Sequence, residues 1–166
     1  MSTQILTLRP LRPADFAPYG DVVELGGDHV LINDGRCKRF SDLSALVAEG
    51  GRVGISLFQS EVQALPYSCT LLERHPHGSQ CFVPMECCTT LYIVAEDDAG
   101  TPVRPKAFVA HGRQAVNIAA NTWHGVLTPL SGGGLYTVID RVDGGPNLEE
   151  YPLGMALTVL PGGGAE

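Results

Sequence analysis

Short apolar segments separated by turn signals recur along the whole chain. Each is rich in β-branched or aromatic residues, and several alternate apolar with polar positions, as half-buried β-strands do. Turn signals such as DDAG, SGGG and DGGP lie between them, where Gly supplies a positive φ and Pro removes a donor from the strand ladder. About ten segments are expected to form strands: GDVVEL, RVGISLFQ, SCTLLERH, CFVPM, TTLYIVAE, KAFVAH, QAVNIA, GVLTPL, LYTVIDRV and MALTVL.

Two segments are expected to be helical instead. RPADFAPYG gives a turn or two that ends before its glycine, and SDLSALVAEGG offers Ser41 as N-cap and Gly50 as terminator. The pattern therefore predicts an all-β protein with one or two short helices. Its strands are expected to close into a barrel or double sheet, because closure hides the edge strands.

The length of 166 residues suits one domain. We expect a single domain over residues 1–160, followed by a flexible tail over residues 161–166, since LPGGGAE has little apolar content to hold it down. No apolar run approaches the ~18 residues of a membrane span. The N-terminal residues lack the uninterrupted apolar stretch of a signal peptide, which predicts a cytoplasmic protein without a membrane partner.

Composition narrows the partners further. Hydrophobic residues make up 44% of the chain and charged residues 17%, which is typical of soluble globular proteins. The formal charge of −7 argues against nucleic-acid binding, which needs clustered Lys and Arg. The five cysteines are an odd number without a CxxC pair, so reduced thiols are expected rather than disulfides or a thiolate zinc site.

The stretch LERHPHGSQCFVPM, residues 71–84, carries the first polar cluster. If its beginning is a strand, alternation places Glu73 and His75 on one face. Pro76 then removes an amide donor, so the chain is expected to leave the ladder there. His77 need not follow the face of His75, and the apparent His-x-His pair is not a reliable motif.

The rest of this stretch and a second polar cluster add further candidates. HGSQ is expected to be a turn whose amides and Ser79 hydroxyl are able to bind an anion, and Gln80 opens the next strand. About 45 positions later, NTWHG brings Asn121 and His124 immediately before another predicted strand. Trp123 in that segment is expected to be core packing more than a stacking platform.

This layout resembles the metal sites of cupin-like barrels, although the match is partial and shifted. Glu73 stands in place of the first His of the cupin motif, His75 of the second, Gln80 of its Glu and His124 of the last His. Such an oxygen and nitrogen set suits a divalent ion such as Mn, Ni or Zn, with Gln as a weak neutral ligand. The same polar groups are alternatively able to contact a substrate directly.

A narrower resemblance covers roughly residues 10–150. An ordered set of segments is similar to the ureidoglycolate lyase family: PADFAPYGDV, INDG, ISLFQ, LERHPHGSQCFVPM, GRQAVN, NTWHGVL, VIDR and NLEE. The resemblance implies a cupin-like double-sheet β-barrel of jelly-roll type, a homodimer and a divalent metal, often nickel. It also implies the splitting of (S)-ureidoglycolate into glyoxylate and urea in allantoin and purine breakdown.

The chain departs from the family pattern at three positions. The family usually has an apolar residue in place of His77 and often an aromatic one in place of Ile118, while His111 stands where a polar, non-titrating residue is expected. The roles of His77 and His111 stay open. None of the three is a residue to which the resemblance assigns catalysis.

The implied reaction is an acid–base elimination, in which the substrate hydroxyl loses a proton while the departing nitrogen gains one. His75 and His124 are the candidates for base and acid, in an order that stays open, and Gln80 completes the catalytic set. In the metal version, the ion is held by Glu73, His75, Gln80 and His124. In the metal-free version, the Ser79 turn and a cation such as Arg141 hold the substrate carboxylate. Asn121 and Asp140 are further candidates for substrate binding.

These versions exclude one another in detail, because one histidine cannot be both a metal ligand and a free base. Asp140 and Arg141 are equally well read as a salt bridge at a strand end. Two alternative functions also remain: a non-catalytic cupin-like sensor of a small carboxylate, and a ureidoglycolate hydrolase that releases ammonia.

Overall fold

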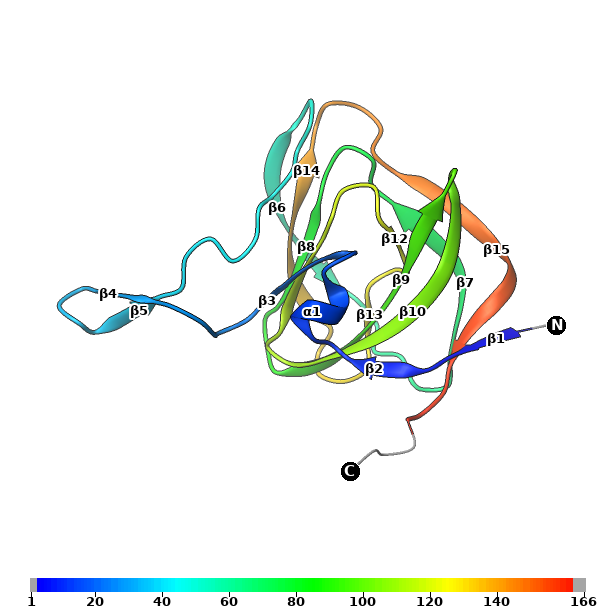
Figure 1. Cartoon of the computed structure of the whole chain (residues 1–166), viewed down its shortest axis with the longest axis horizontal. Coiled ribbons are helices and arrows are strands. Elements are labelled where there is room, and N and C mark those ends of the chain that lie inside the picture. Colours follow the sequence, from blue (N-terminus) through cyan, green and yellow to red (C-terminus); the bar gives the residue numbers. More distant parts are fainter. Residues whose placement is uncertain (1–2, 163–166) are drawn as a thin grey trace.

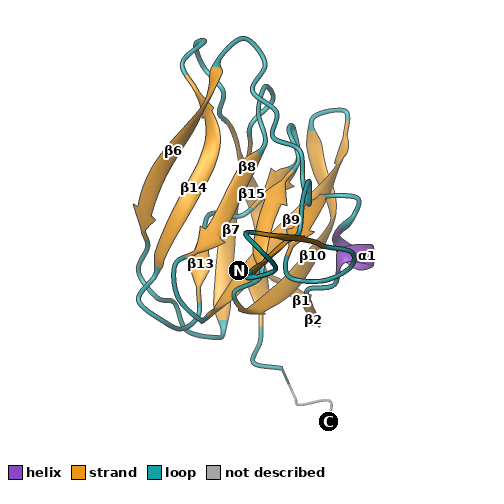
Figure 2. Cartoon of the chain, turned by 90° about the vertical axis from the view of Figure 1, so that its left-hand side faces the viewer, coloured by secondary structure: helices purple, strands orange, loops and turns teal. Residues whose placement is uncertain are grey.

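The computed structural model describes residues 3–162, and the predicted all-β fold is confirmed. Two sheets face one another and form a cupin-like barrel with one short helix on its outer side (Figures 1 and 2). Residues 163–166 of the predicted tail lie outside the described residues. Among residues 3–162, no helix has the length and apolar character needed to cross a bilayer.

The larger sheet has eight strands, most of them antiparallel neighbours. Two parallel pairs, β1 with β15 and β2 with β10, lie at its ends. In spatial order its strands are β1 (Thr3–Leu6), β15 (Glu149–Val159), β7 (Tyr67–Arg74), β12 (Trp123–His124), β9 (Cys88–Asp98), β10 (Thr101–Gly112) and β2 (Leu8–Pro10), with β13 (Thr128–Pro129) also paired to β9.

The smaller sheet has five strands, and all the pairings within it are antiparallel. Its spatial order is β3 (Gly20–Val23), β11 (Ala115–Ile118), β8 (Gln80–Pro84), β14 (Leu135–Val142) and β6 (Arg52–Gln59). A two-stranded hairpin of β4 (Val30–Ile32) and β5 (Cys37–Arg39) projects from the barrel (Figure 1). These two strands, together with β1, β2 and β12, were not among the predicted segments.

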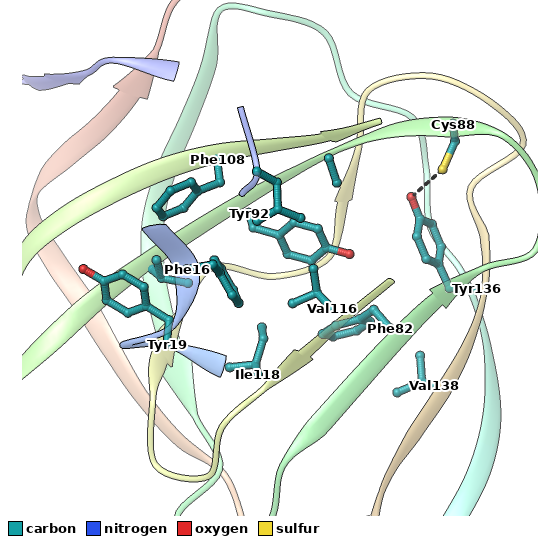
Figure 3. Packing of buried hydrophobic residues seen from close by; sticks show 13 residues of the cluster. Phe16, Tyr19, Phe82, Cys88, Tyr92, Phe108, Val116, Ile118, Tyr136 and Val138 are labelled. Carbon is teal, nitrogen blue, oxygen red and sulfur yellow. Dashed lines mark hydrogen bonds between the residues drawn. The ribbon is translucent and has the colours of Figure 1, made fainter. Parts of the chain in front are cut away.

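Aromatic side chains fill the main core between the two sheets. Phe16 of the helix α1 (Pro13–Phe16) is fully buried, and its ring meets that of Phe108 edge-on at 5.5 Å. Figure 3 shows this cluster, which continues through Phe82 and Tyr92 to Tyr136. Burial of these large rings stabilises the packing of the two sheets against one another.

A second core lies on the other face of the larger sheet, because that sheet curls. Leu91 and Ile93 of β9 point into it, whereas Tyr92 and Val94 point into the main core, as strand alternation requires. Trp123 is buried in this second core, which confirms the packing role predicted for it. All five cysteines are free thiols, as expected.

One helix is present where predicted, and the second predicted helix is wrong. Residues 41–47 have no regular structure, and Asp42 has a φ of 55°, which interrupts a right-handed helix. Asn117 of β11 donates its amide to Ser44 Oγ and to the Ala45 carbonyl, at 2.8 and 2.9 Å. The segment thus satisfies its polar groups against the smaller sheet and not within a helix.

Candidate active site

Glu73 and His124 come from neighbouring strands of the larger sheet. Antiparallel pairing of β7 with β12 sets the two residues opposite one another, and His124 Nε2 lies 3.6 Å from Glu73 Oε1. His75 follows one residue beyond the end of β7, with its ring centroid 5.4 Å from that of His124. The donor atoms of Glu73, His75 and His124 all lie within 4.8 Å of one another. Strand alternation had predicted that Glu73 and His75 share a face.

Both histidines use Nδ1 to bond a backbone carbonyl, which leaves Nε2 as the free ring nitrogen. His75 Nδ1 lies 2.8 Å from the Asn147 carbonyl oxygen, and His124 Nδ1 lies 2.9 Å from that of Thr122. A carbonyl only accepts, so each Nδ1 carries the proton in the neutral ring and each Nε2 carries the lone pair. Both Nε2 atoms are buried without a hydrogen-bond partner in the described structure. Such unpartnered buried atoms are typical of a site that binds something.

Gln80 reaches the site from the opposite sheet. It opens β8 beside Asp140 of β14, and its Nε2 donates to Asp140 Oδ2 at 3.2 Å. Because Asp140 occupies the amide nitrogen, the amide oxygen is fixed in the other direction, and this Oε1 is also buried without a partner. The structure therefore adds a neutral acceptor, oriented by a carboxylate, to the two histidines.

A cavity of about 440 Å³ joins these groups to the outside. Eight residues line it, and Glu73 is the one titratable residue among them. His75 and His124 are not among these lining residues, but their ligand atoms lie within 4.8 Å of that of Glu73, which is. The wall combines the apolar Phe58, Phe82, Val126 and Leu127 with the polar Gln59, Ser60, Glu73 and Gln80.

Burial changes the proton affinity of two site residues in opposite directions. It lowers the pKa of His124 from 6.5 to about 4; the hydrogen bond to the Thr122 carbonyl opposes this effect and His75 adds to it. Burial raises the pKa of the Glu73 carboxyl; His75 opposes this rise and Glu150 adds to it. At neutral pH, His124 is thus a neutral imidazole with a free lone pair.

This depressed pKa predicts acid sensitivity of the metal-stripped protein. Between about pH 6.5 and 4 the unfolded chain protonates His124 while the folded chain does not, so stability falls as the pH falls. From pH 7 to 5 the loss from this residue is about 2 kcal/mol. Urea unfolding at the two pH values measures it. His124→Gln should remove that part of the pH dependence, and an unchanged slope would refute the assignment.

The substrate-binding residues predicted around this site have mixed placements. Asp140 lies beside Gln80, as described. Ser79 Oγ accepts a hydrogen bond from the Val47 amide at 2.9 Å, and Asn121 is exposed, with its backbone N–H donating to the His75 carbonyl at 2.8 Å. The Arg141 guanidinium donates to three backbone carbonyls. The structure thus engages Ser79 and Arg141 in holding loops, whereas Gln80 lines the cavity and Asp140 holds its side chain from behind by a hydrogen bond.

His77 lies apart from Glu73, His75 and His124, which are called the triad below, as predicted from the break at Pro76. Its side chain is about half exposed, and its Nδ1 lies 3.8 Å from a carboxylate oxygen of Glu49. His111 is also exposed, on β10. Neither imidazole is among the three residues grouped as potential metal ligands in the described chain.

Sequence reasoning missed several residues of the site. Phe58, Gln59 and Ser60 bring the end of β6 to the cavity, and the Asn147 carbonyl orients His75. The sequence offered a signal for three of them: Phe58 and Gln59 lie in ISLFQ and Asn147 lies in NLEE, and both segments resemble the family. Their partners are distant along the chain, so only the fold shows what they contact.

The triad fits a divalent ion by its chemistry. One carboxylate and two imidazoles supply oxygen and nitrogen ligands suited to Mn, Ni, Zn or Fe, and both imidazole lone pairs are unpartnered. Each Nδ1–H is bonded to a carbonyl, as is usual for metal-ligating histidines. Gln80 Oε1 is available as a further neutral ligand.

A cupin-like double-sheet barrel with this triad beside an open cavity is typical of an enzyme that acts on a small molecule. The family model described as ureidoglycolate lyase matches residues 3–160, and the chain belongs to that family.

Named relatives agree with this membership. The ureidoglycolate lyase of Rhodobacter capsulatus is 47% identical over 156 residues, which cover 93% of this chain and 97% of that protein. The one from Mesorhizobium japonicum is 42% identical over 149 residues, covering 88% and 91%. Among solved structures, a dTDP sugar isomerase from Desulfovibrio desulfuricans is 16% identical with a TM-score of 0.42, covering 81% of this chain and 85% of that chain.

Proposed function

We propose that this protein is a ureidoglycolate lyase that splits (S)-ureidoglycolate into glyoxylate and urea. Family membership supports the reaction class. The observation that carries the proposal is the pair of buried, unpartnered histidine Nε2 atoms beside Glu73, the one titratable residue in the cavity lining. A group that exchanges a proton with a substrate must be able to touch it, and Glu73 meets this condition.

The elimination moves one proton within the substrate. The O–H bond breaks and its electrons form the glyoxylate C=O bond, while the C–N bond breaks and its electrons are protonated as urea leaves. In the site without an ion, Glu73 takes the hydroxyl proton and returns it to the departing nitrogen, and its raised pKa suits both steps. His124 Nε2, 3.6 Å away, shares the proton in between.

The two histidines have a second use when a divalent ion is bound. Glu73, His75 and His124 would then hold the ion, with Gln80 as a neutral fourth ligand. Such an ion supplies Lewis acidity, which lowers the pKa of a coordinated hydroxyl. Asp140 orients Gln80 in either case, so that the amide oxygen and not its nitrogen faces the site.

The finer parts of the proposal come from the family resemblance. They are nickel as the ion, a homodimer, a cytoplasmic location and a place in allantoin breakdown. The proposal also treats residues 1–160 as one domain.

A product assay tests the proposed function. Purified protein supplied with (S)-ureidoglycolate is expected to release urea and glyoxylate in equal amounts, measured by a urease-coupled assay and by glyoxylate reduction. Ammonia released before urease is added would instead identify a hydrolase of the ureido group. No turnover, with retained binding of glyoxylate by calorimetry, would favour the sensor.

A further inference from the structure

The loop after β14 passes beside His75 and contacts it through one residue. Asn147 accepts two hydrogen bonds: its carbonyl oxygen lies 2.8 Å from His75 Nδ1, and its side-chain Oδ1 receives the His77 backbone N–H at 2.7 Å. Asn147 therefore holds the turn of residues 75–78 at two points, the imidazole and the backbone. We propose that Asn147 is a positioning residue that fixes the tautomer and direction of the His75 ring.

The loop that carries Asn147 is itself fixed by Arg141. The guanidinium of this nearly buried arginine donates to the carbonyls of Gly144 and Gly145, at 2.6 and 3.1 Å. A third bond of 2.6 Å reaches the Glu49 carbonyl, just before β6. These bonds hold the beginning of the loop, at residues 144 and 145, whereas its end at Asn147 is held by the hydrogen bond from the His77 N–H to the Asn147 side chain.

Close backbone packing holds the turn against this loop. A Cβ on Gly78 would lie 2.7 Å from Arg141 Cβ and 3.3 Å from Asn147 Nδ2. A Cβ on Gly144 would lie 2.0 Å from the Gly50 carbonyl oxygen. No side chain fits at either position, so the Gly78 backbone packs closely on the Arg141 and Asn147 side chains, and the Gly144 backbone packs on that of Gly50.

The chemical consequence concerns which nitrogen of His75 is free. With Nδ1–H bonded to the Asn147 carbonyl, the lone pair is on Nε2, which is buried without a hydrogen-bond partner. If the loop moved away, the neutral ring would also populate the tautomer with the proton on Nε2, and in that tautomer the Nε2 atom cannot accept a proton or bind an ion. The effect on rate rests on the proposed function, but the tautomer does not.

Two variants of nearly equal shape test the proposal. Asn147→Leu keeps the volume and the backbone carbonyl but removes the side-chain acceptor for the His77 N–H, so the end of the loop loses its bond to the turn. Asn147→Asp keeps a side-chain acceptor oxygen. Long-range ¹H–¹⁵N correlation spectra of the metal-stripped protein at pH 8 report the tautomer of each histidine. We expect the Nδ1–H form of His75 in the wild type and in Asn147→Asp, and a mixture in Asn147→Leu.

His124 is an internal control in the same spectra, because the Thr122 carbonyl holds it independently of Asn147. It should keep the Nδ1–H form in every variant, and a shift of both histidines would show general disruption and overturn the proposal. An Nε2–H form of His75 in the wild type, or no change in Asn147→Leu, would overturn it as well. If Asn147→Leu does not fold, Asn147→Ala removes the same acceptor and is measured in its place.

Kinetics give the second readout. Loss of a partner that orients a site histidine typically costs ~10–100-fold in activity. We expect a fall of this size in kcat for Asn147→Leu with KM little changed, and recovery of most of the kcat in Asn147→Asp. If even the wild type releases no urea, the proposed function fails, while the tautomer spectra still decide the role of Asn147.

Discussion

Replacing His124 by glutamine is expected to lower the kcat of urea release by ~10²–10⁴, the usual contribution of a positioned proton-transfer group. Glutamine has a similar reach but no imidazole lone pair, so it cannot share the proton of Glu73, and its neutral amide oxygen is a weaker ligand for a divalent ion. The His124 Nε2 atom is 3.6 Å from Glu73 and has no other partner in the described structure. The measurement is steady-state urea release at saturating substrate.

His77→Gln is the matched control for this variant. His77 is half exposed and faces Glu49, outside the triad, so its replacement should leave kcat within about twofold, as for surface changes in general. Circular dichroism and urea unfolding establish that His124→Gln is folded. A folded His124→Gln protein with wild-type kcat would contradict the assignment of the site, and so would a large loss in His77→Gln.

Local pattern was sufficient for the strands of the barrel. RVGISLFQ became β6 with the predicted bounds, Arg52–Gln59, because its β-branched and aromatic content favours an extended strand, although Val53, Ile55 and Leu57 are exposed. The second helix failed for a tertiary reason. The apolar spacing after Ser41 suits a helix, but hydrogen bonds that this segment accepts from Asn117 and donates to Ser79 favour an irregular path. No local rule contains those partners.

The same distinction applies to the candidate site. The two-residue repeat of a strand predicts that Glu73 and His75 share a face, and the break at Pro76 predicts that His77 does not join them. The sequence could not predict that Arg141 holds loops and not a substrate, because its three carbonyl partners belong to loops whose path only the fold defines. The cavity likewise depends on the end of β6, which meets Glu73 and Gln80 only after the two sheets close.

These loop contacts bear on how a substrate carboxylate is held. None of the eight residues that line the cavity is Lys or Arg. Arg141 donates to three carbonyls, and Ser79 Oγ holds the Val47 amide. The two groups assigned to the carboxylate in a metal-free site are therefore engaged elsewhere, which favours an ion at Glu73, His75 and His124 as the anchor.

Glu73→Gln is accordingly expected to weaken divalent-ion binding by more than the ~10–100-fold that loss of an outer partner costs, because it removes a charged ligand. Calorimetric titration of metal-stripped protein with Ni²⁺ or Co²⁺ measures the affinity, and the visible spectrum of bound Co²⁺ reports its ligands. Chelation should abolish urea release in the wild type, and metal add-back should restore it.

Glu49→Gln is the control for this experiment, since Glu49 is an exposed acid that faces His77 and lies outside the triad. It should bind the ion as the wild type does. Stripped wild-type protein that keeps its full kcat and binds no ion would refute the metal version. The catalytic proton would then move between Glu73 and His124 without an ion, and His124→Gln and Glu73→Gln should lose urea release to a similar extent, because both residues would carry that one proton.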